Sequence, residues 1–349
     1  MLNYCININH DILNLISELD EFKVRWQAIN TLSFDRLSLL KKSATIESIA
    51  SSTRIEGVKL TDEQVEKLLL KVSKKSLKNR DEQEVLGYAD AMNIVLENFN
   101  ELKISENYIK QLHLIMLKHG SKDLSHCGEY KKISNNVVAR DAKGKEIGII
   151  FKTATPFETP IKMANLLQWV NNAIELKTMH PLIITAVFVV IFLAIHPFCD
   201  GNGRLSRIIT NLLLLKFGYS YVQYSSLESV IEYNKDLYYK HLRDCQITLD
   251  QKNPQFENWI LFFLKSLKKQ KDNLEQRVKI EKILQENLDD LHLEILKLLK
   301  HHKKLAISDI CKLIKANRNT LKVKLKNLVE MKKIKTFGKG RGVVYEIQI

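Results

Sequence analysis

The chain has 349 residues, of which 45% are hydrophobic and 27% charged, so it is long enough for two or three domains and too apolar for a disordered protein. With only 12 Gly and 5 Pro, it is unlike a loop-rich β protein and suits a mainly α fold. Five scattered cysteines without a CxxC pair argue against a disulfide framework or a zinc site, so we expect reduced thiols in a cytoplasmic protein.

No segment predicts a signal peptide or a membrane span. The first residues lack a charged region followed by an apolar run. The most apolar stretch, residues 182–195, is shorter than the roughly 20 residues that a bilayer requires. We therefore expect a buried core helix there and no membrane partner.

Residues 1–100 predict an N-terminal helical domain. Thr61 is placed to cap a helix, because acidic residues follow it in the first turn. Gly57 is placed to end the preceding helix. The expected helices of this region cover residues 10–20, 38–51, 61–72 and 81–98.

Residues 101–275 predict a core that contains the apolar helix. His180-Pro181 favours a helix start there. Residues 136–152 alternate around Asp-Ala-Lys-Gly, which predicts a β-hairpin with its turn near Gly144. A further helix is expected at 205–216, and a long polar-faced helix at 257–287 leads into the last domain.

Residues 276–349 predict a connecting helix and a winged helix-turn-helix. We expect a helix at 291–301, a short helix capped by Ser308 that runs through Ile314, and a helix from Asn317 to Lys332. Two strands should follow within 334–349. From position 291 on, 15 Lys and Arg face 4 Asp and Glu, a net charge of +11 that attracts phosphates. DNA would meet Arg318 and Lys322 on the recognition helix and Lys339 and Arg341 on the wing; a protein-docking or homodimer-forming module stays open.

The segment from His196 to Arg207 combines the parts of a polyphosphate site. Asp200-Gly201-Asn202-Gly203 predicts a tight turn whose amides point inward, next to a helix N-terminus. Arg204 and Arg207 are spaced for one helix face and offer forked donors to phosphate oxygens. Asp200 is a hard ligand suited to Mg²⁺, and His196 is a base near neutral pH.

The motif His-Pro-Phe-x-Asp-Gly-Asn-Gly-Arg-x-x-Arg, read from His196 to Arg207, resembles the signature of the Fic family at every specified position. The resemblance implies a helical bundle with a β-hairpin flap. It also implies a protein adenylyltransferase that binds ATP and transfers AMP to a Ser, Thr or Tyr hydroxyl of a target protein, itself included.

The resemblance assigns roles to several residues of the loop. His196 deprotonates the incoming hydroxyl, and Asp200 holds Mg²⁺ between the α- and β-phosphates. Asn202 and the backbone of Gly201 and Gly203 cradle the phosphates. Arg204 and Arg207 neutralise the β- and γ-phosphates.

Three further segments of the chain resemble segments found in members of the Fic family. The 136–153 hairpin resembles the flap that pairs with the target's backbone. Tyr238 and Tyr239 match a run that lines the adenine pocket, although either could instead pack in the core. Ser52, Glu56 and Gly57 match an inhibitory motif, in which Glu56 pairs with Arg207 and prevents productive ATP binding.

Other functions stay open at this stage. The chain could be a DNA-binding regulator whose core senses a nucleotide, although His196 would then be unnecessary. The loop recognises phosphates rather than the base, so transfer of another nucleotide monophosphate, or removal of AMP, is an alternative within the enzyme class.

Overall fold

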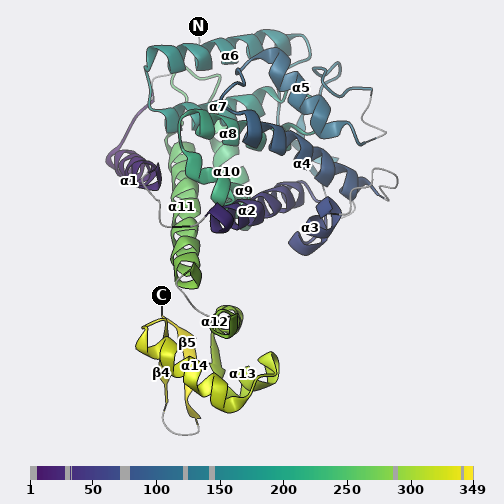
Figure 1. Cartoon of the computed structure of the whole chain (residues 1–349). Helices are drawn as coiled ribbons and strands as arrows, with labels where there is room; N and C mark the ends of the chain where they lie inside the picture. The colour runs from purple at the N-terminus through teal and green to yellow at the C-terminus, as the bar shows by residue number, and fades with distance from the viewer. Residues whose placement is uncertain are drawn as a thin grey trace. The chain divides into compact units, whose positions relative to one another are not determined.

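A computed structural model describes residues 6–27, 32, 34–70, 79–120, 125–140, 146–285, 290–338 and 342–348. The chain forms two compact units, which Figure 1 draws without fixing their relative position. The larger unit comprises Met1–Ala28 and Leu39–Asp272, and the smaller one Ile29–Ser38 and Asn273–Ile349. The expected boundary near residue 276 lies close to this division, whereas residues 39–100 share the unit of the predicted core because α4 packs against α8.

The larger unit is mainly α, as the sequence predicts. Its helices are α1 (His10–Gln27), most of α2 (Phe34–Ile55), α3 (Asp62–Leu70), α4 (Arg80–Asn98), α5 (Glu106–Leu117), α6 (Glu158–Leu176), α7 (Pro181–Ile195), α8 (Asn202–Lys216), α9 (Leu227–Tyr233), α10 (Lys235–Gln246) and the first part of α11 (Glu257–Gln285), with a 3₁₀ turn at Ser220–Tyr224.

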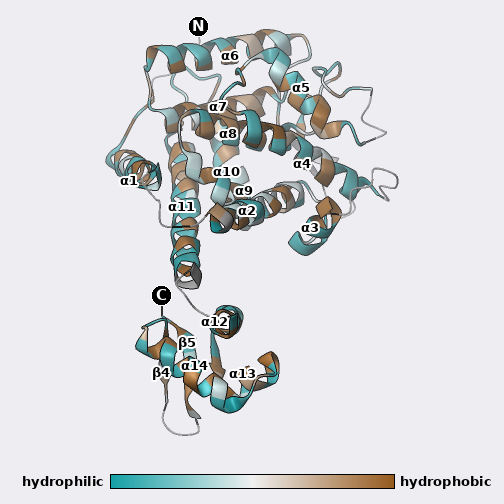
Figure 2. Cartoon of the chain, viewed as in Figure 1, coloured by the Kyte–Doolittle hydropathy of each residue, from teal (hydrophilic) through white to brown (hydrophobic). Residues whose placement is uncertain are grey.

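The predicted core helix is confirmed as α7, which begins at Pro181 with His180 as its N-cap. Nearly all of its side chains are buried, and it contacts α6, α8 and α10. Figure 2 colours the chain by hydropathy, and α7 is among its most apolar segments. Within the described part of the chain, no helix is both long and apolar enough to cross a bilayer. Because α7 packs against three other helices, the start of the loop that follows Ile195 is held in place.

The helix ends on either side of residues 57–61 follow their sequence signals. Thr61 and Gln64 form a reciprocal capping box at α3: the Gln64 amide donates to Thr61 Oγ1 at 3.3 Å and the Thr61 amide to Gln64 Oε1 at 2.9 Å. Gly57 follows α2 with a φ of +107°, which glycine adopts without a steric penalty. Both predicted caps are confirmed.

The predicted hairpin is confirmed as β1 (Val137–Arg140) paired antiparallel with β2 (Glu146–Phe151). Val137 lies opposite Phe151, so the hairpin ends at residues close to the loop after α7. The expected turn at Gly144 lies outside the described residues.

The smaller unit contains α12 (Asp290–His302), β3 (Lys304–Ala306), α13 (Ile307–Ile314), α14 (Arg318–Glu330), β4 (Ile334–Phe337) and β5 (Val344–Ile347). The three strands form an antiparallel sheet in the order β3-β5-β4. Eight buried aliphatic residues from α12, α13, α14 and β4 make a core of its own. Ser308 is not the cap of α13: pairing of β3 with β5 holds Ala306 extended, and α13 begins directly after it.

Candidate functional site

The loop after α7 starts from a left-handed residue. His196 ends α7 with φ 52° and ψ 61°, and its amide donates to Phe192 O at 2.9 Å. A left-handed residue followed by proline is a common way to stop a helix. This conformation turns the chain out of the helix axis and sets the imidazole at the start of the loop.

Asn202 closes the loop from within. Its side-chain Oδ1 accepts from the Phe198 amide at 3.0 Å, and its Nδ2 donates to Phe198 O at 2.7 Å. The sequence predicted a phosphate contact for Asn202, but the structure commits its buried side chain to the loop backbone. The amides of Asn202, Gly203 and Arg204 belong to the first turn of α8, where no intrahelical acceptor exists. Backbone amides, rather than the Asn202 side chain, are therefore the donors that this turn offers to an anion.

His113 of α5, which the sequence did not single out, supports the loop from below. Its ring stacks on Phe198 with 3.8 Å between centroids. Nδ1 accepts from the Gly128 amide at 2.9 Å, so Nε2 carries the proton and donates to Asp200 O at 3.0 Å. Burial lowers the pKa of His113 to about 4 and keeps this tautomer neutral. No local motif marks such a residue, because its partners lie far away in the sequence.

The two loop glycines are required for different reasons. Gly201 has a φ of +77°, and a Cβ there would lie 2.6 Å from Met116 Cε. Gly203 has an ordinary φ, but a Cβ there would lie 2.2 Å from Glu56 Oε1. The carboxylate of Glu56 thus lies directly against the start of α8.

Arg204 and Asp200 belong to a ring of four charges that includes two residues of α4. Arg204 is 2% exposed and donates to Glu84 Oε2 at 2.9 Å and to Asp200 Oδ2 at 3.2 Å. Arg80 contacts the same two carboxylates, at 2.7 Å to Glu84 Oε1 and 3.3 Å to Asp200 Oδ2. Burial would raise the pKa of Asp200, but the charges of Arg204 and Arg80 and the Gly201 amide hold it below its usual value.

Arg207 is held by the end of α2. Its guanidinium is 4% exposed and donates to Ser52 Oγ at 2.8 Å, Ser52 O at 3.0 Å and Glu56 Oε1 at 2.7 Å. Burial opposes the charged form of Arg207, but the charge of Glu56 and the nearby tyrosine hydroxyls together raise its pKa above the usual value. The structure therefore brings together Ser52, Glu56 and Arg207 as the sequence predicted, with Gly57 one residue beyond.

The end of α2 is itself anchored to α9 and α10. Arg54 pairs with Glu232 through Nε at 2.7 Å and Nη2 at 2.9 Å, and with Asp62 through Nη1 at 2.7 Å. Lys235 Nζ donates to Ile55 O at 2.5 Å, at the carbonyl end of the helix. These contacts fix the point from which Glu56 extends.

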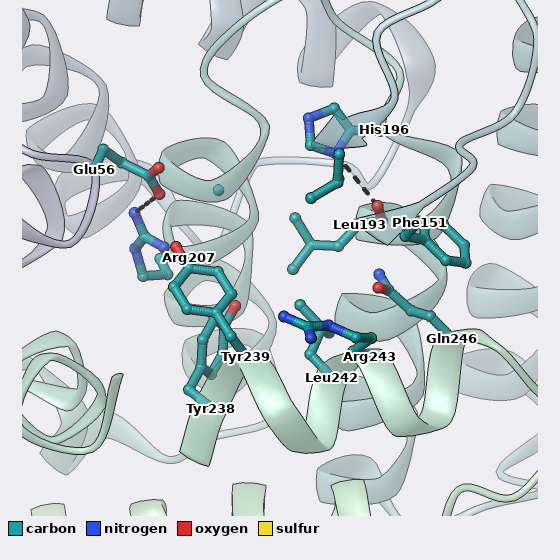
Figure 3. A pocket seen from close by; sticks show the side chains of 12 residues that line it. Glu56, Phe151, Leu193, His196, Arg207, Tyr238, Tyr239, Leu242, Arg243 and Gln246 are labelled. Carbon is teal, nitrogen blue, oxygen red and sulfur yellow. Dashed lines mark hydrogen bonds and ion pairs between the residues drawn. The ribbon is translucent and has the colours of Figure 1, made fainter. Parts of the chain in front are cut away.

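A cavity of about 220 Å³ opens beside the loop (Figure 3). Tyr238 and Tyr239 both line it, but they differ in burial. Tyr238 is 3% exposed and packs edge-on against Trp259, so it is chiefly a core residue. Tyr239 is only partly buried. The cavity is lined by Glu56, Val137, Phe151, Leu193, His196, Gly203, Arg207, Tyr238, Tyr239, Leu242, Arg243 and Gln246.

His196 enters this cavity as a neutral imidazole. Its Nδ1 lies 3.4 Å from Leu193 O, and a carbonyl can only accept, so Nδ1 carries the proton. Burial lowers the pKa of His196 to about 4, and the charge of Lys131 contributes in the same direction. Nε2 is thus left with a lone pair that can accept a proton.

Asp200 is the one loop residue suited to a metal ion. Among the described residues there is no group of three or more His, Cys, Asp or Glu that could hold a metal by itself. The Asp200 carboxylate is 42% exposed, which fits a cation that arrives with phosphates and keeps several waters, as Mg²⁺ does.

In the smaller unit, Arg318 and Lys322 are exposed on the first turns of α14, whose N-cap is Asn317. Lys339 and Arg341 lie outside the described residues.

Comparisons with known proteins agree on one family. Residues 103–214 match the Fic/DOC family. The protein adenylyltransferase Fic of Drosophila mojavensis is 30% identical over 208 residues, which are 58% of this chain and 38% of that protein. The Drosophila melanogaster protein of the same name is 30% identical over 183 residues, or 51% and 34%. The chain thus spans less than two fifths of the length of these relatives.

Solved structures share the fold. A Fic family protein from Desulfovibrio desulfuricans superposes with a TM-score of 0.63 at 23% identity, covering 99% of this chain and 98% of the other. A Fic domain containing signaling protein from Bacteroides thetaiotaomicron gives a TM-score of 0.56 at 22% identity, covering 77% and 95%.

Proposed function

We propose that this chain, whose residues 103–214 match the Fic/DOC family, transfers AMP from ATP to a hydroxyl side chain of a target protein. The observation that carries the proposal is the single cavity that joins His196, Gly203, Arg207 and Tyr239. A base, an amide cradle, a guanidinium and an aromatic ring are the groups that an adenylyl transfer site requires.

The base acts first. A hydroxyl that enters the cavity gives its proton to Nε2 of His196, while Nδ1 keeps its hydrogen bond to Leu193 O. The hydroxyl oxygen then forms a bond to the α-phosphorus of ATP, and the bond from that phosphorus to the α,β-bridging oxygen breaks. Pyrophosphate leaves, and the target side chain carries AMP. General base catalysis of this kind contributes about 10²–10⁴-fold to a rate.

The loop holds the phosphates through the amides at the start of α8 and through Arg207, which lines the cavity. Arg204 acts from a more buried position, paired with Glu84. Asp200 would hold Mg²⁺, which supplies positive charge to the α- and β-phosphates. Tyr239 would stack on the adenine, and Tyr238 would support it from the core.

Glu56 acts as a brake on this site. Its carboxylate occupies Arg207 at 2.7 Å and lies against Gly203, so a phosphate oxygen and the carboxylate compete for the same donors. The Glu56 carboxylate and a phosphate repel each other when both lie at the Arg207 guanidinium. ATP can then bind, but its terminal phosphates do not reach Arg207. Rotation of the Glu56 side chain away from Arg207 restores the cradle.

The target meets the enzyme at the hairpin. β1 and β2 form a two-stranded sheet, and Val137 and Phe151 at its open end line the cavity. An extended segment of the target that pairs with a hairpin edge would carry its hydroxyl toward His196. The protein itself is one such target.

The test is incubation of the Glu56→Gly variant with α-³²P-ATP and Mg²⁺, followed by mass spectrometry of labelled protein. We expect AMP on Ser, Thr or Tyr, and loss of the label by at least 100-fold in Glu56→Gly/His196→Ala. Unlabelled protein in Glu56→Gly, or label that survives His196→Ala, refutes the proposal. UTP and GTP as substrates separate AMP transfer from transfer of another nucleotide, and incubation of labelled protein without ATP detects AMP removal.

The architecture and surface charges of the smaller unit support a second, separate function, which is DNA binding. Its element order and three-stranded sheet are those expected of a winged helix, and the exposed Arg318 and Lys322 open α14. Binding of the full chain to duplex DNA should weaken steeply with salt, and Arg318→Ala/Lys322→Ala should flatten that slope by about two units. Binding that is absent at low salt would leave protein docking as the role of this unit.

A further inference from the structure

The backbone of the loop is held at four consecutive carbonyls by one short segment, residues 131–135. Lys131 Nζ donates to Ile195 O at 3.0 Å, and the Lys131 amide donates to Pro197 O at 2.9 Å. Asn135 Nδ2 lies 3.4 Å from His196 O and 2.5 Å from Phe198 O. The carbonyls on both sides of the catalytic imidazole are therefore fixed from outside the motif.

Lys131 also holds the base of the hairpin. Its ammonium donates to Asn135 Oδ1 at 2.8 Å, just before β1, and to Thr153 Oγ1 at 2.9 Å, just after β2. Thr153 Oγ1 donates in turn to Asn135 Oδ1 at 3.2 Å, and the Thr153 amide to Asn136 Oδ1 at 3.2 Å. One ammonium group thus joins both ends of the hairpin to the last carbonyl of α7.

The Lys131 ammonium is buried, and its hydrogen-bond acceptors carry no negative charge. Lys131 is 2% exposed, and all three of its acceptors are neutral oxygens. A buried cation is costly unless its donors are satisfied, and the negative end of the α7 dipole lies at Ile195 O. Since a neutral donor could fill the same space at lower cost, the charge and its three-way geometry point to a role in the site.

We infer that Lys131 is a positioning residue, which fixes His196 and the target-binding hairpin to each other. The inference rests on the proposed function, because it assigns the hairpin to the target and His196 to the hydroxyl. Without the three-way contact, the loop and the hairpin can move independently, and a displacement of about 1 Å can cost on the order of 100-fold in rate.

Lys131 acts on the imidazole through its charge as well. Burial lowers the pKa of Lys131 to about 8, so the ammonium stays largely charged at pH 7. That charge lowers the pKa of His196, whereas the carboxylates of Glu56 and Asp200 raise it. In a Glu56→Gly background, Asp200 is the remaining one of these two carboxylates. The pKa of His196 then reports the effect of the Lys131 charge without the opposing effect of Glu56.

The experiment compares Lys131→Met and Lys131→Arg with the matched control Lys132→Met, an exposed neighbour, all in the Glu56→Gly background. Two measurements need no activity: amide hydrogen exchange across the loop and the hairpin, and the NMR titration of His196. For Lys131→Met we expect faster exchange at both places and a higher pKa of His196. Lys132→Met should match the parent.

Transfer kinetics provide the third measurement. Lys131→Met should lower kcat by about 10- to 100-fold with less than a threefold change in KM for ATP, and Lys131→Arg should recover part of kcat. Parent-like exchange and kcat in Lys131→Met would overturn the inference, as would equal effects in Lys132→Met. If the parent transfers no AMP but exchange and titration shift as expected, the proposed function fails and the positioning role stands.

If Lys131→Met does not fold, Thr153→Val decides the question, because it removes one acceptor and keeps the side-chain shape. It should accelerate exchange at the hairpin base and lower kcat in a protein that still folds, as cooperative thermal unfolding would show. Parent-like exchange and kcat in a folded Thr153→Val would also overturn the inference.

Discussion

Replacing Glu56 with glycine should release the site. The carboxylate donates no proton and accepts one charge-assisted hydrogen bond from Arg207 at 2.7 Å, with the guanidinium 4% and the carboxylate 30% exposed. A hydrogen bond to a charged group contributes about 1.5–3 kcal/mol, and each 1.4 kcal/mol is tenfold in an equilibrium constant. ATP must overcome this contact to reach Arg207, so Glu56→Gly should raise kcat/KM for AMP transfer by about 10- to 100-fold.

The stability of the nucleotide-free protein should change in the opposite direction. Loss of the same contact leaves the buried Arg207 without its carboxylate partner while its contacts to Ser52 remain, so the melting temperature of Glu56→Gly should fall. Saturating Mg²⁺-ATP should then raise the melting temperature of the variant more than that of the parent, since tighter ligands stabilise more. Label uptake and thermal unfolding measure the two effects separately.

A double-mutant cycle tests whether the pair itself is responsible. In an Arg207→Ala background, Glu56→Gly should give a much smaller gain in ATP affinity, because its contact with the guanidinium is already absent. Glu56→Gln, which keeps a neutral acceptor, should gain less than Glu56→Gly. Equal gains with and without Arg207, or no gain in Glu56→Gly despite detectable transfer, would refute the brake.

Three further outcomes follow from the site. The rate of AMP transfer should stay level from pH 6 to 7 and fall on acidification toward pH 4, because burial lowers the pKa of His196 to about 4 and only the neutral imidazole is a base. An inflection near 6.5 in the pH–rate profile would contradict this. Gly201→Ala should lower stability by about 1–2 kcal/mol in thermal unfolding, since its positive φ disfavours a side chain and the new Cβ would press on Met116. Tyr239→Ala should weaken ATP binding to Glu56→Gly by about 5- to 150-fold in calorimetry, whereas Tyr239→Phe should not.

The elements of the fold were predictable where local signals are strong. The apolar run of α7, the capping residue Thr61 and the alternation of the hairpin each gave the correct element, because periodicity and caps are properties of neighbouring residues. Ser308 failed as a cap because strand pairing at Ala306, a long-range contact, decided where α13 begins.

The site was predictable at the motif and not around it. Arg207 contacts Ser52 and Glu56 as expected. This long-range contact could be predicted because the Fic family, which both motifs resemble, makes the equivalent contact. His113 and Glu84 were missed, since each meets the loop across about 90 to 120 positions of sequence with no local pattern. Asn202 was assigned to the phosphates because its side chain could serve either role, and only the structure shows the two bonds to Phe198.

The contacts at the end of α2 also indicate how the proposed brake would be released. Arg54 and Lys235 tie the end of α2 to α9 and α10, so moving the helix would break several buried or partly buried polar contacts at once. Glu56 itself lies beyond the last helical residue, in a turn, and its side chain is 30% exposed. Rotating one side chain costs far less than displacing a clamped helix, so α2 should stay in place while Glu56 turns away and Ser52 keeps its hold on Arg207. A structure of the nucleotide complex in which α2 has shifted by a helical turn would contradict the expectation that Glu56 rotates while α2 stays in place.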